Sequence, residues 1–127
     1  MTPNRPGFCT GVDILRVKRL EKSLENPRFL TRVYGSTELE LWERRGKNLL
    51  FLAGNFCAKE AFSKALGTGI RGFALSEVEV LRDDLGKPYF HLSGNAARIV
   101  SEKNLAFDVS LSHEGEYAVA FVVAWQS

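Results

Sequence analysis

The chain has 127 residues, of which 45% are apolar and 25% are charged. This length and composition suit one folded domain with a hydrophobic core, and they exclude a disordered segment and a two-domain chain. The net charge of +2 is too small to indicate general binding to nucleic acid. We therefore expect one domain over residues 1–127.

The first half of the chain predicts a strand followed by helices. A short strand over 7–14 ends near Asp13, and the spacing of apolar residues predicts a basic helix over 16–25. A charged helix over 37–45 follows a glycine-serine turn. The longest and clearest helix covers 48–66 and ends at a glycine.

The second half of the chain predicts mainly strands. Strands are expected over 75–82 and 89–92, separated by turn residues, and over 107–111 and 117–125. A short helix over 95–103 lies between the two pairs. This order indicates an α+β domain with a mainly antiparallel sheet packed on the long helix.

Charge and cysteine content suggest a partner and a compartment. Seven lysines and arginines but three acidic residues lie between residues 1 and 32, and this local excess favours an acidic partner. Cys9 and Cys57 predict buried thiols in a reducing compartment, although a disulfide between them is a second possibility. No signal peptide or bilayer-length apolar run is present in the sequence, so a cytoplasmic protein without a membrane segment is expected.

Two acidic residues are candidates for a site. Asp13 follows apolar residues at the end of a strand, where burial is costly unless the carboxylate is paired or binds a cation; the alternative is a helix N-cap. Glu60 belongs to a charged group with Lys59 and Lys64 inside a largely apolar helix. The alternative for Glu60 is a surface ion pair with Lys64, four residues later.

Two further segments allow more than one interpretation. Gly67-Thr68-Gly69 can simply end the long helix, or it can bind phosphate with Lys64 supplying positive charge, because a helix C-terminus repels anions. His113 lies in the expected turn between the last two strands. It can be an ordinary turn residue, a phosphate or base ligand, or a proton shuttle.

The order and spacing of these segments resemble those of a known family. The matching blocks are GVDI at 11–14, FCAKEAFSKALGTGI at 56–70 and LSHE at 111–114, followed by Tyr117-Ala118. Together they closely resemble the holo-acyl-carrier-protein synthases, the small stand-alone 4′-phosphopantetheinyl transferases. The resemblance runs from about Gly11 to about Ala124.

The resemblance implies a fold, an assembly and a reaction. The fold is the α+β 4′-phosphopantetheinyl transferase fold, assembled as a homotrimer with active sites between neighbours. The reaction moves 4′-phosphopantetheine from coenzyme A to a serine of apo-acyl carrier protein for fatty-acid synthesis, and releases 3′,5′-ADP. Asp13 and Glu60 match the residues that bind Mg²⁺ in this family.

The resemblance also implies roles for other residues. Lys64, Gly67 and Thr68 match positions along the coenzyme A phosphates, and Lys87, Pro88 and His113 match segments near its nucleotide. Arg19, on the basic first helix, matches a position that docks the acidic carrier protein. For the base that accepts the serine proton, Glu60, directly or through a metal-bound water, is preferred and His113 is the second candidate.

One position departs from the family pattern. Asn55 stands where relatives often carry an arginine that helps to neutralise coenzyme A phosphates. Lys47, or Arg44 and Arg45, would replace that charge if these side chains face the same groove.

Two other functions are weighed against the transferase. A coenzyme A-binding module without catalysis would not need both Asp13 and Glu60. A nucleic-acid binder that uses the first helix is disfavoured by Glu21 and Glu25 in that helix and by the low net charge.

Overall fold

The computed structural model describes residues 7–127. These residues form an α+β domain with eleven elements in the order strand, four helices, 3-10 turn, hairpin, helix and hairpin. The elements are β1 (Phe8–Arg16), α1 (Val17–Ser23), α2 (Phe29–Val33), α3 (Ser36–Arg44), α4 (Leu49–Leu66), η1 (Leu75–Glu77), β2 (Val78–Arg82), β3 (Pro88–Leu92), α5 (Gly94–Glu102), β4 (Leu105–Glu114) and β5 (Tyr117–Gln126).

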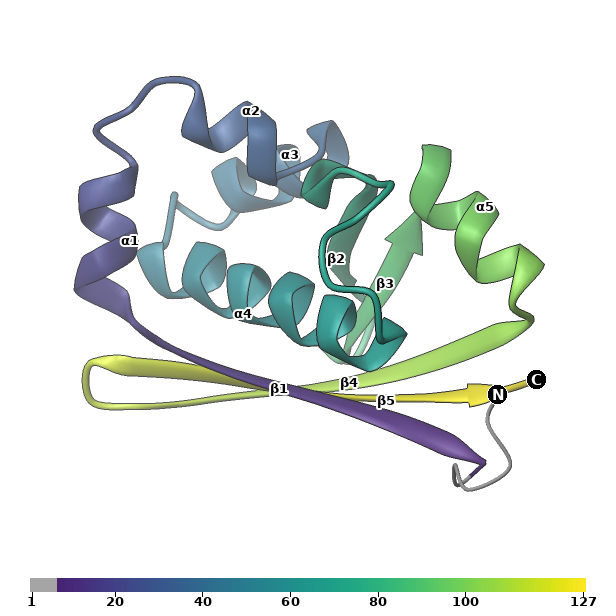
Figure 1. Cartoon of the computed structure of the whole chain (residues 1–127). Helices are drawn as coiled ribbons and strands as arrows, with labels where there is room; N and C mark the ends of the chain where they lie inside the picture. The colour runs from purple at the N-terminus through teal and green to yellow at the C-terminus, as the bar shows by residue number, and fades with distance from the viewer. Residues whose placement is uncertain (1–6) are drawn as a thin grey trace.

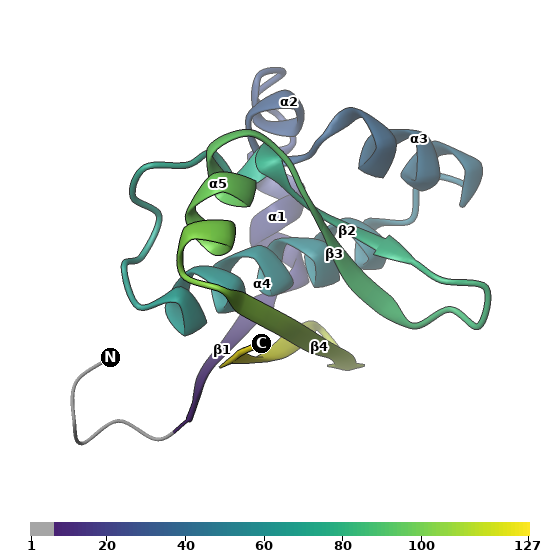
Figure 2. The same cartoon turned by 90° about the vertical axis from the view of Figure 1, so that its right-hand side faces the viewer.

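The strands form two antiparallel sheets. The larger sheet has the order β1-β5-β4, and β2 pairs with β3 in a separate hairpin. Helix α4 lies across one face of the larger sheet (Figure 1), while β3 packs near β4 at one side of α4 (Figure 2). The prediction of an α+β domain with an antiparallel sheet packed on the long helix is confirmed.

Local sequence explains where α4 begins, ends and meets the sheet. The side chain of Asn48 caps its first turn by accepting a hydrogen bond from Leu50 N at 2.8 Å. Gly67 ends the helix in the left-handed conformation, with φ of 87°. Gly11 in β1 allows close approach, because a Cβ there would collide with the backbone of α4 at Ala61. The sheet therefore packs directly against the helix.

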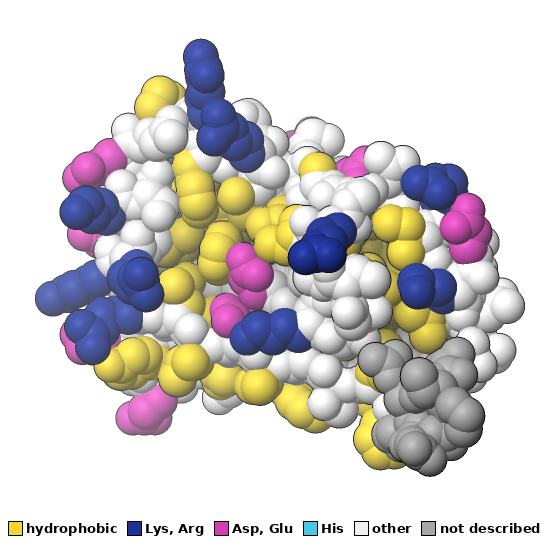
Figure 3. Space-filling model, viewed as in Figure 1, with side chains coloured by type: hydrophobic (Ala, Val, Ile, Leu, Met, Phe, Trp, Pro, Cys, Tyr) yellow, Lys and Arg dark blue, Asp and Glu magenta, His cyan; other side chains and the backbone are white. Residues whose placement is uncertain are grey.

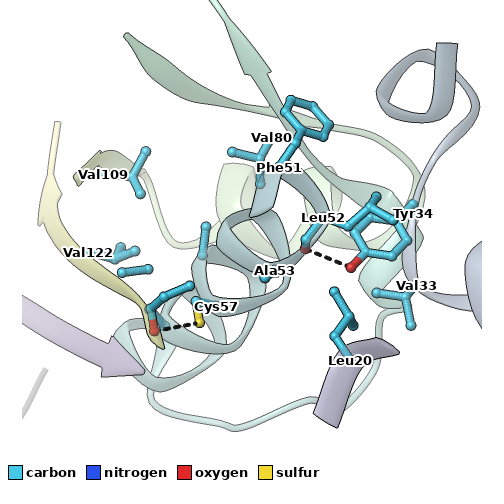
Figure 4. Packing of buried hydrophobic residues seen from close by; sticks show 14 of the residues in the cluster. Leu20, Val33, Tyr34, Phe51, Leu52, Ala53, Cys57, Val80, Val109 and Val122 are labelled. Carbon is cyan, nitrogen blue, oxygen red and sulfur yellow. Dashed lines mark hydrogen bonds between the residues drawn. The ribbon is translucent and has the colours of Figure 1, made fainter. Parts of the chain in front are cut away.

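The main core lies between α4, the larger sheet and the first three helices (Figure 4). Tyr34 is buried, and its hydroxyl donates to Leu52 O at 2.7 Å. Cys57 is also buried and its thiol faces Ala118 O at 3.5 Å. Both cysteines are free, as preferred from the sequence, although Cys9 is only half-buried.

Several element boundaries differ from the sequence prediction. Strand β1 continues to Arg16, so Asp13 lies within the strand rather than near its end. The N-cap of α1 is Arg16, which excludes the alternative role of Asp13 as that helix cap. Helix α2 was not predicted, and β4 extends through His113, which therefore lies in a strand and not in a turn.

The outer face of the larger sheet, which points away from α4, carries exposed apolar side chains. Ile14 is 65% exposed, Val12 54% and Phe121 48%. The inward positions of β5 are small and buried because α4 lies against them. Among residues 7–127, no helix is both long and apolar enough to cross a membrane.

Candidate active site

Asp13, Glu60 and Lys64 come together between β1 and α4. Side chains of β1 alternate, and Asp13 occupies the face toward α4 while the apolar Val12 and Ile14 point outward. Lys64 Nζ lies 3.4 Å from Asp13 Oδ1 and donates to Val12 O at 2.8 Å. Figure 3 shows acidic side chains in the middle of this face, bordered by apolar ones.

The two carboxylates influence each other electrostatically. Burial, and next the negative charge of Asp13, raise the pKa of Glu60, while Lys64 partly offsets this rise. The alternative Glu60–Lys64 surface ion pair is not formed in the described chain, because Lys64 pairs with Asp13 instead. The arrangement therefore places two acidic groups beside each other with a single cation.

This donor set suits a hard divalent cation. Mg²⁺ is commonly held by one or two carboxylates together with substrate phosphates and water. Within residues 7–127, no group of three or more His, Cys, Asp or Glu side chains forms a complete protein site. The two carboxylates consequently fit a metal ion that shares its remaining positions with a substrate.

Gly67 and Thr68 follow this cluster along the chain. Gly67 N donates to Lys64 O at 3.1 Å, and both residues are exposed. The hydroxyl of Thr68 donates to Gly69 O at 3.2 Å. Ending the helix is thus one role of this segment, and its exposed position next to Lys64 leaves it accessible to a ligand.

His113 and Pro88 line a surface recess away from this cluster. This recess lies where the N-terminal half of α4 meets β4 and the β2–β3 hairpin, and its other polar lining residues include Arg45, Asn48, Arg82 and Ser112. Lys87 does not line it. The ammonium of Lys87 donates to Asp108 Oδ1 at 2.7 Å and to Val109 O at 3.2 Å.

One protomer does not bring the two groups of predicted site residues together. Asp13 is on β1 and His113 is on β4, which are the two edge strands of the sheet, with β5 between them. On α4, Gly54 lines the recess, and Glu60 lies six residues later, about 9 Å along the axis and about 240° around it. Neither histidine is visible on the face in Figure 3.

Lys59, the neighbour of Glu60, has a structural role. It is fully buried, and its ammonium lies 2.7 Å from Glu38 Oε1 and donates to Leu75 O and Val78 O. Lys59 therefore differs from Glu60 and Lys64, the other members of the charged group, because its ammonium lies inside the core. Neither the burial of Lys59 nor its pairing with Glu38 was predicted from the sequence.

Asn55 is fully buried and does not line the recess, although its Oδ1 accepts from Arg82, which does. Arg45 lines the recess, as one of the compensating cations expected from the sequence, whereas Arg44 and Lys47 do not. Arg82 also lines it and was missed, because its contact with Asn55, 27 residues earlier, depends on tertiary folding.

Arg19 lies exposed on α1, at a second surface recess. Ile14, Arg16 and Tyr117 line this recess with it. Arg16 is held there, because its guanidinium donates to the Tyr117 hydroxyl at 2.9 Å. Figure 3 shows several basic side chains gathered over α1, so the predicted basic surface exists.

Comparison with known proteins identifies the family. The model of the 4′-phosphopantetheinyl transferase superfamily matches residues 9–122. A holo-[acyl-carrier-protein] synthase of Clostridium botulinum is 42% identical over 114 residues, covering 89% of this chain and 93% of the relative. A Fusobacterium nucleatum protein of the same name is 42% identical over 115 residues, covering 89% and 94%.

Solved structures agree with the sequence comparison. The crystal structure of a Neisseria meningitidis holo-[acyl-carrier-protein] synthase superposes with a TM-score of 0.87 at 34% identity, covering 93% of this chain and 98% of that one. A Bacillus anthracis synthase in complex with CoA (3′,5′-ADP) gives a TM-score of 0.78 at 35% identity, covering 94% and 96%. The chain therefore belongs to the holo-[acyl-carrier-protein] synthases of the 4′-phosphopantetheinyl transferase superfamily.

Proposed function

We propose that the chain transfers 4′-phosphopantetheine from coenzyme A to a serine of apo-acyl carrier protein, with Mg²⁺ bound by Asp13 and Glu60. Membership of the family supports the transfer itself. The observation that carries the proposed site is the convergence of Asp13, Glu60 and Lys64 from β1 and α4, because two carboxylates beside one cation are unfavourable without a further positive charge.

The chain's residues have separate roles around the coenzyme A diphosphate. When bound, Mg²⁺ would neutralise negative charge on the phosphate oxygens of the transition state. The Lys64 ammonium adds charge on the same side, and Gly67 and Thr68 leave room beside it for the phosphates. His113 and Pro88 bind the nucleotide part in the recess at β4. Lys87 supports that edge of the sheet through its contact with Asp108.

Glu60 is the proposed general base. The serine oxygen forms a bond to the phosphorus that carries pantetheine, the bond from that phosphorus to the bridging oxygen breaks, and 3′,5′-ADP leaves. The serine proton passes to the Glu60 carboxylate. His113 is the second candidate, because the recess that it lines is assigned to the nucleotide part of coenzyme A rather than to the reacting phosphorus.

The complete site is proposed to form between copies of the chain in a homotrimer. The separation of the cluster at β1 from the recess at β4 supports this, because α4 packs on β1 and β5 between them and blocks a direct path within one protomer. The exposed apolar outer face of the sheet provides a surface that a second copy would cover.

The acidic carrier protein is proposed to dock on α1. Arg19 and its basic neighbours Lys18 and Lys22 are exposed there. This charge is near the recess that Arg16 and Tyr117 line, so the docked carrier lies close to the Asp13 strand.

One reaction tests the transferase against the non-catalytic alternative. Purified protein is mixed with coenzyme A, Mg²⁺ and apo-acyl carrier protein, and the carrier mass is read by mass spectrometry. Addition of one phosphopantetheine in the presence of Mg²⁺, and its loss on metal chelation, supports the proposal. Coenzyme A binding without any change in carrier mass would instead identify a binding module.

A further inference from the structure

Two guanidinium groups converge in the recess lined by His113. The guanidinium carbons of Arg45 and Arg82 lie 5.8 and 4.7 Å from the ring centre of Phe51. Across residues 7–127, neither guanidinium is within ion-pair distance of a carboxylate. Burial and the charge of Arg45 lower the pKa of Arg82 to about 10, so Arg82 remains charged at neutral pH. Two cations held together without an acid favour an anionic ligand.

The Arg82 side chain is held in one orientation by hydrogen bonds. Its Nη2 donates to Asn55 Oδ1 at 2.8 Å, and its Nη1 donates to Val80 O at 3.3 Å and Leu81 O at 3.2 Å. A guanidinium has five N–H donors, so these contacts leave Nε and one hydrogen of Nη2 for a ligand. The fixed orientation lowers the entropy cost of binding that ligand.

Asn55 is itself locked by a buried network. Its Nδ2 donates to Glu38 Oε2 at 2.8 Å and to Val80 O at 3.0 Å, which leaves Oδ1 free to accept from Arg82. The Glu38 carboxylate lies 2.7 Å from the Lys59 ammonium. Since Lys59 balances the charge of Glu38, the positive charge of Arg82 remains available in the recess.

We propose that Arg82 binds a phosphate of the coenzyme A nucleotide and that Asn55 is the positioning residue that orients its guanidinium. This assignment rests on the proposed function, which places the nucleotide in the same recess. The 3′-phosphate is the candidate group, because the diphosphate is assigned to Lys64 and the acidic pair. Arg82, at the end of β2, thus supplies the positive charge that the family pattern expects from an arginine on α4, and the buried amide of Asn55 on α4 orients it.

Calorimetric titration of the metal-free protein with coenzyme A and with 3′-dephospho-coenzyme A tests the assignment. The wild-type protein should bind coenzyme A more tightly than the dephospho form. Arg82→Gln should reduce this preference roughly ten- to hundredfold, since a charge-assisted hydrogen bond contributes about 1.5–3 kcal/mol. Arg82→Lys should restore part of it, and Arg98→Gln, on the exposed face of α5, should leave it unchanged.

Asn55→Leu tests positioning, because it removes the acceptor without changing the charge of Arg82. It should weaken binding of coenzyme A while binding of the dephospho form stays the same. Equal weakening of both ligands would show a purely structural role for Asn55. Since this variant also disturbs the Glu38 network, its thermal unfolding is measured alongside, and Arg82→Gln tests the same contact without disturbing that network.

The proposal fails if Arg82→Gln keeps the full preference for coenzyme A. That result is distinct from failure of the proposed function, in which the wild-type protein would bind neither ligand, or would bind coenzyme A without changing the mass of the carrier protein.

Discussion

Asp13 is the inward-facing charge in a strand whose outward neighbours, Val12 and Ile14, are apolar and exposed. This reverses the usual pattern of a sheet edge, in which the apolar side chains point inward. The carboxylate is kept next to α4 because Gly11, two residues earlier, lets the strand approach the helix closely. The position of the Asp13 carboxylate beside α4 therefore depends on Gly11 as well as on Asp13.

The first prediction concerns the acidic pair. Asp13→Asn and Glu60→Gln should each lower the transfer rate about 10²–10³-fold, by loss of charge stabilisation in the transition state. If both residues bind one ion, the double variant should be barely slower than either single variant. Steady-state rates with saturating Mg²⁺ measure this, with circular dichroism as the folding control. Fully additive losses would show that the two acids act separately.

The second prediction concerns stability and pH. The folded pKa of Glu60 is raised, so the stability that its protonated form contributes is lost as pH rises through this pKa. Without metal, Glu60→Gln should therefore become more stable relative to wild type between about pH 4 and pH 7. Denaturant unfolding at each pH measures this difference in stability. Lys64→Gln should instead become less stable relative to wild type over the same range, because Lys64 lowers the pKa of Glu60 and its removal lets that pKa rise further.

Adding Mg²⁺ provides the complementary measurement. The ion should raise the free energy of unfolding of the wild-type protein and leave that of Glu60→Gln nearly unchanged, since ligands stabilise the state that binds them. A pH-independent difference between the two proteins without metal would contradict a raised pKa of Glu60.

Single residues differ in how far the sequence reveals them. Asp13, Glu60 and Lys64 were predicted together because the family motif fixes their spacing. The pairing of Lys59 with Glu38 was not, since a buried cation finds its partner through tertiary packing, here across 21 residues. Arg82 was missed for the same reason, as nothing at the end of a hairpin strand indicates that Asn55 lies beside it.

At the scale of elements, α1 is a short helix with an exposed basic surface. The third prediction is that Arg19→Glu raises the KM for carrier protein at least tenfold, since a like charge then meets an acidic partner. Binding of coenzyme A should stay near the wild-type value, and rising salt should weaken carrier binding in the same direction. Arg98→Glu is the matched control on α5. Equal KM values for the two variants would move the docking surface away from α1.

Elements with strong local patterns were predicted well. The cap at Asn48 and the glycine at position 67 fixed both ends of α4 to within one residue. The turn at 83–86 likewise separated β2 from β3. The end of β1 was missed because strand pairing with β5 continues through Arg16, a long-range contact that local sequence does not encode. The five-residue α2 is too short for a clear periodic pattern.

At the scale of the whole molecule, the outer face of the β1-β5-β4 sheet remains apolar and uncovered. The fourth prediction is that the wild-type protein elutes as a trimer in gel filtration with light scattering. Phe121→Asp should dissociate it by placing a charge in the apolar interface. Leu85→Asp is the control, since Leu85 is 96% exposed at a hairpin turn away from that face. A fully active monomer would contradict assembly through the sheet.

The separation of the acidic cluster on β1 from the recess on β4 has a consequence for enzymology. If neighbouring copies each supply half of a site, specific activity should decline on dilution below the assembly constant while every chain stays folded. Two variants impaired in opposite halves, Glu60→Gln and Arg82→Gln, should then restore some activity when they are co-expressed, because a fraction of mixed assemblies contains one site with both halves intact. Such intragenic complementation would follow from the strand order β1-β5-β4, which places the two halves of the site on opposite edges of the sheet.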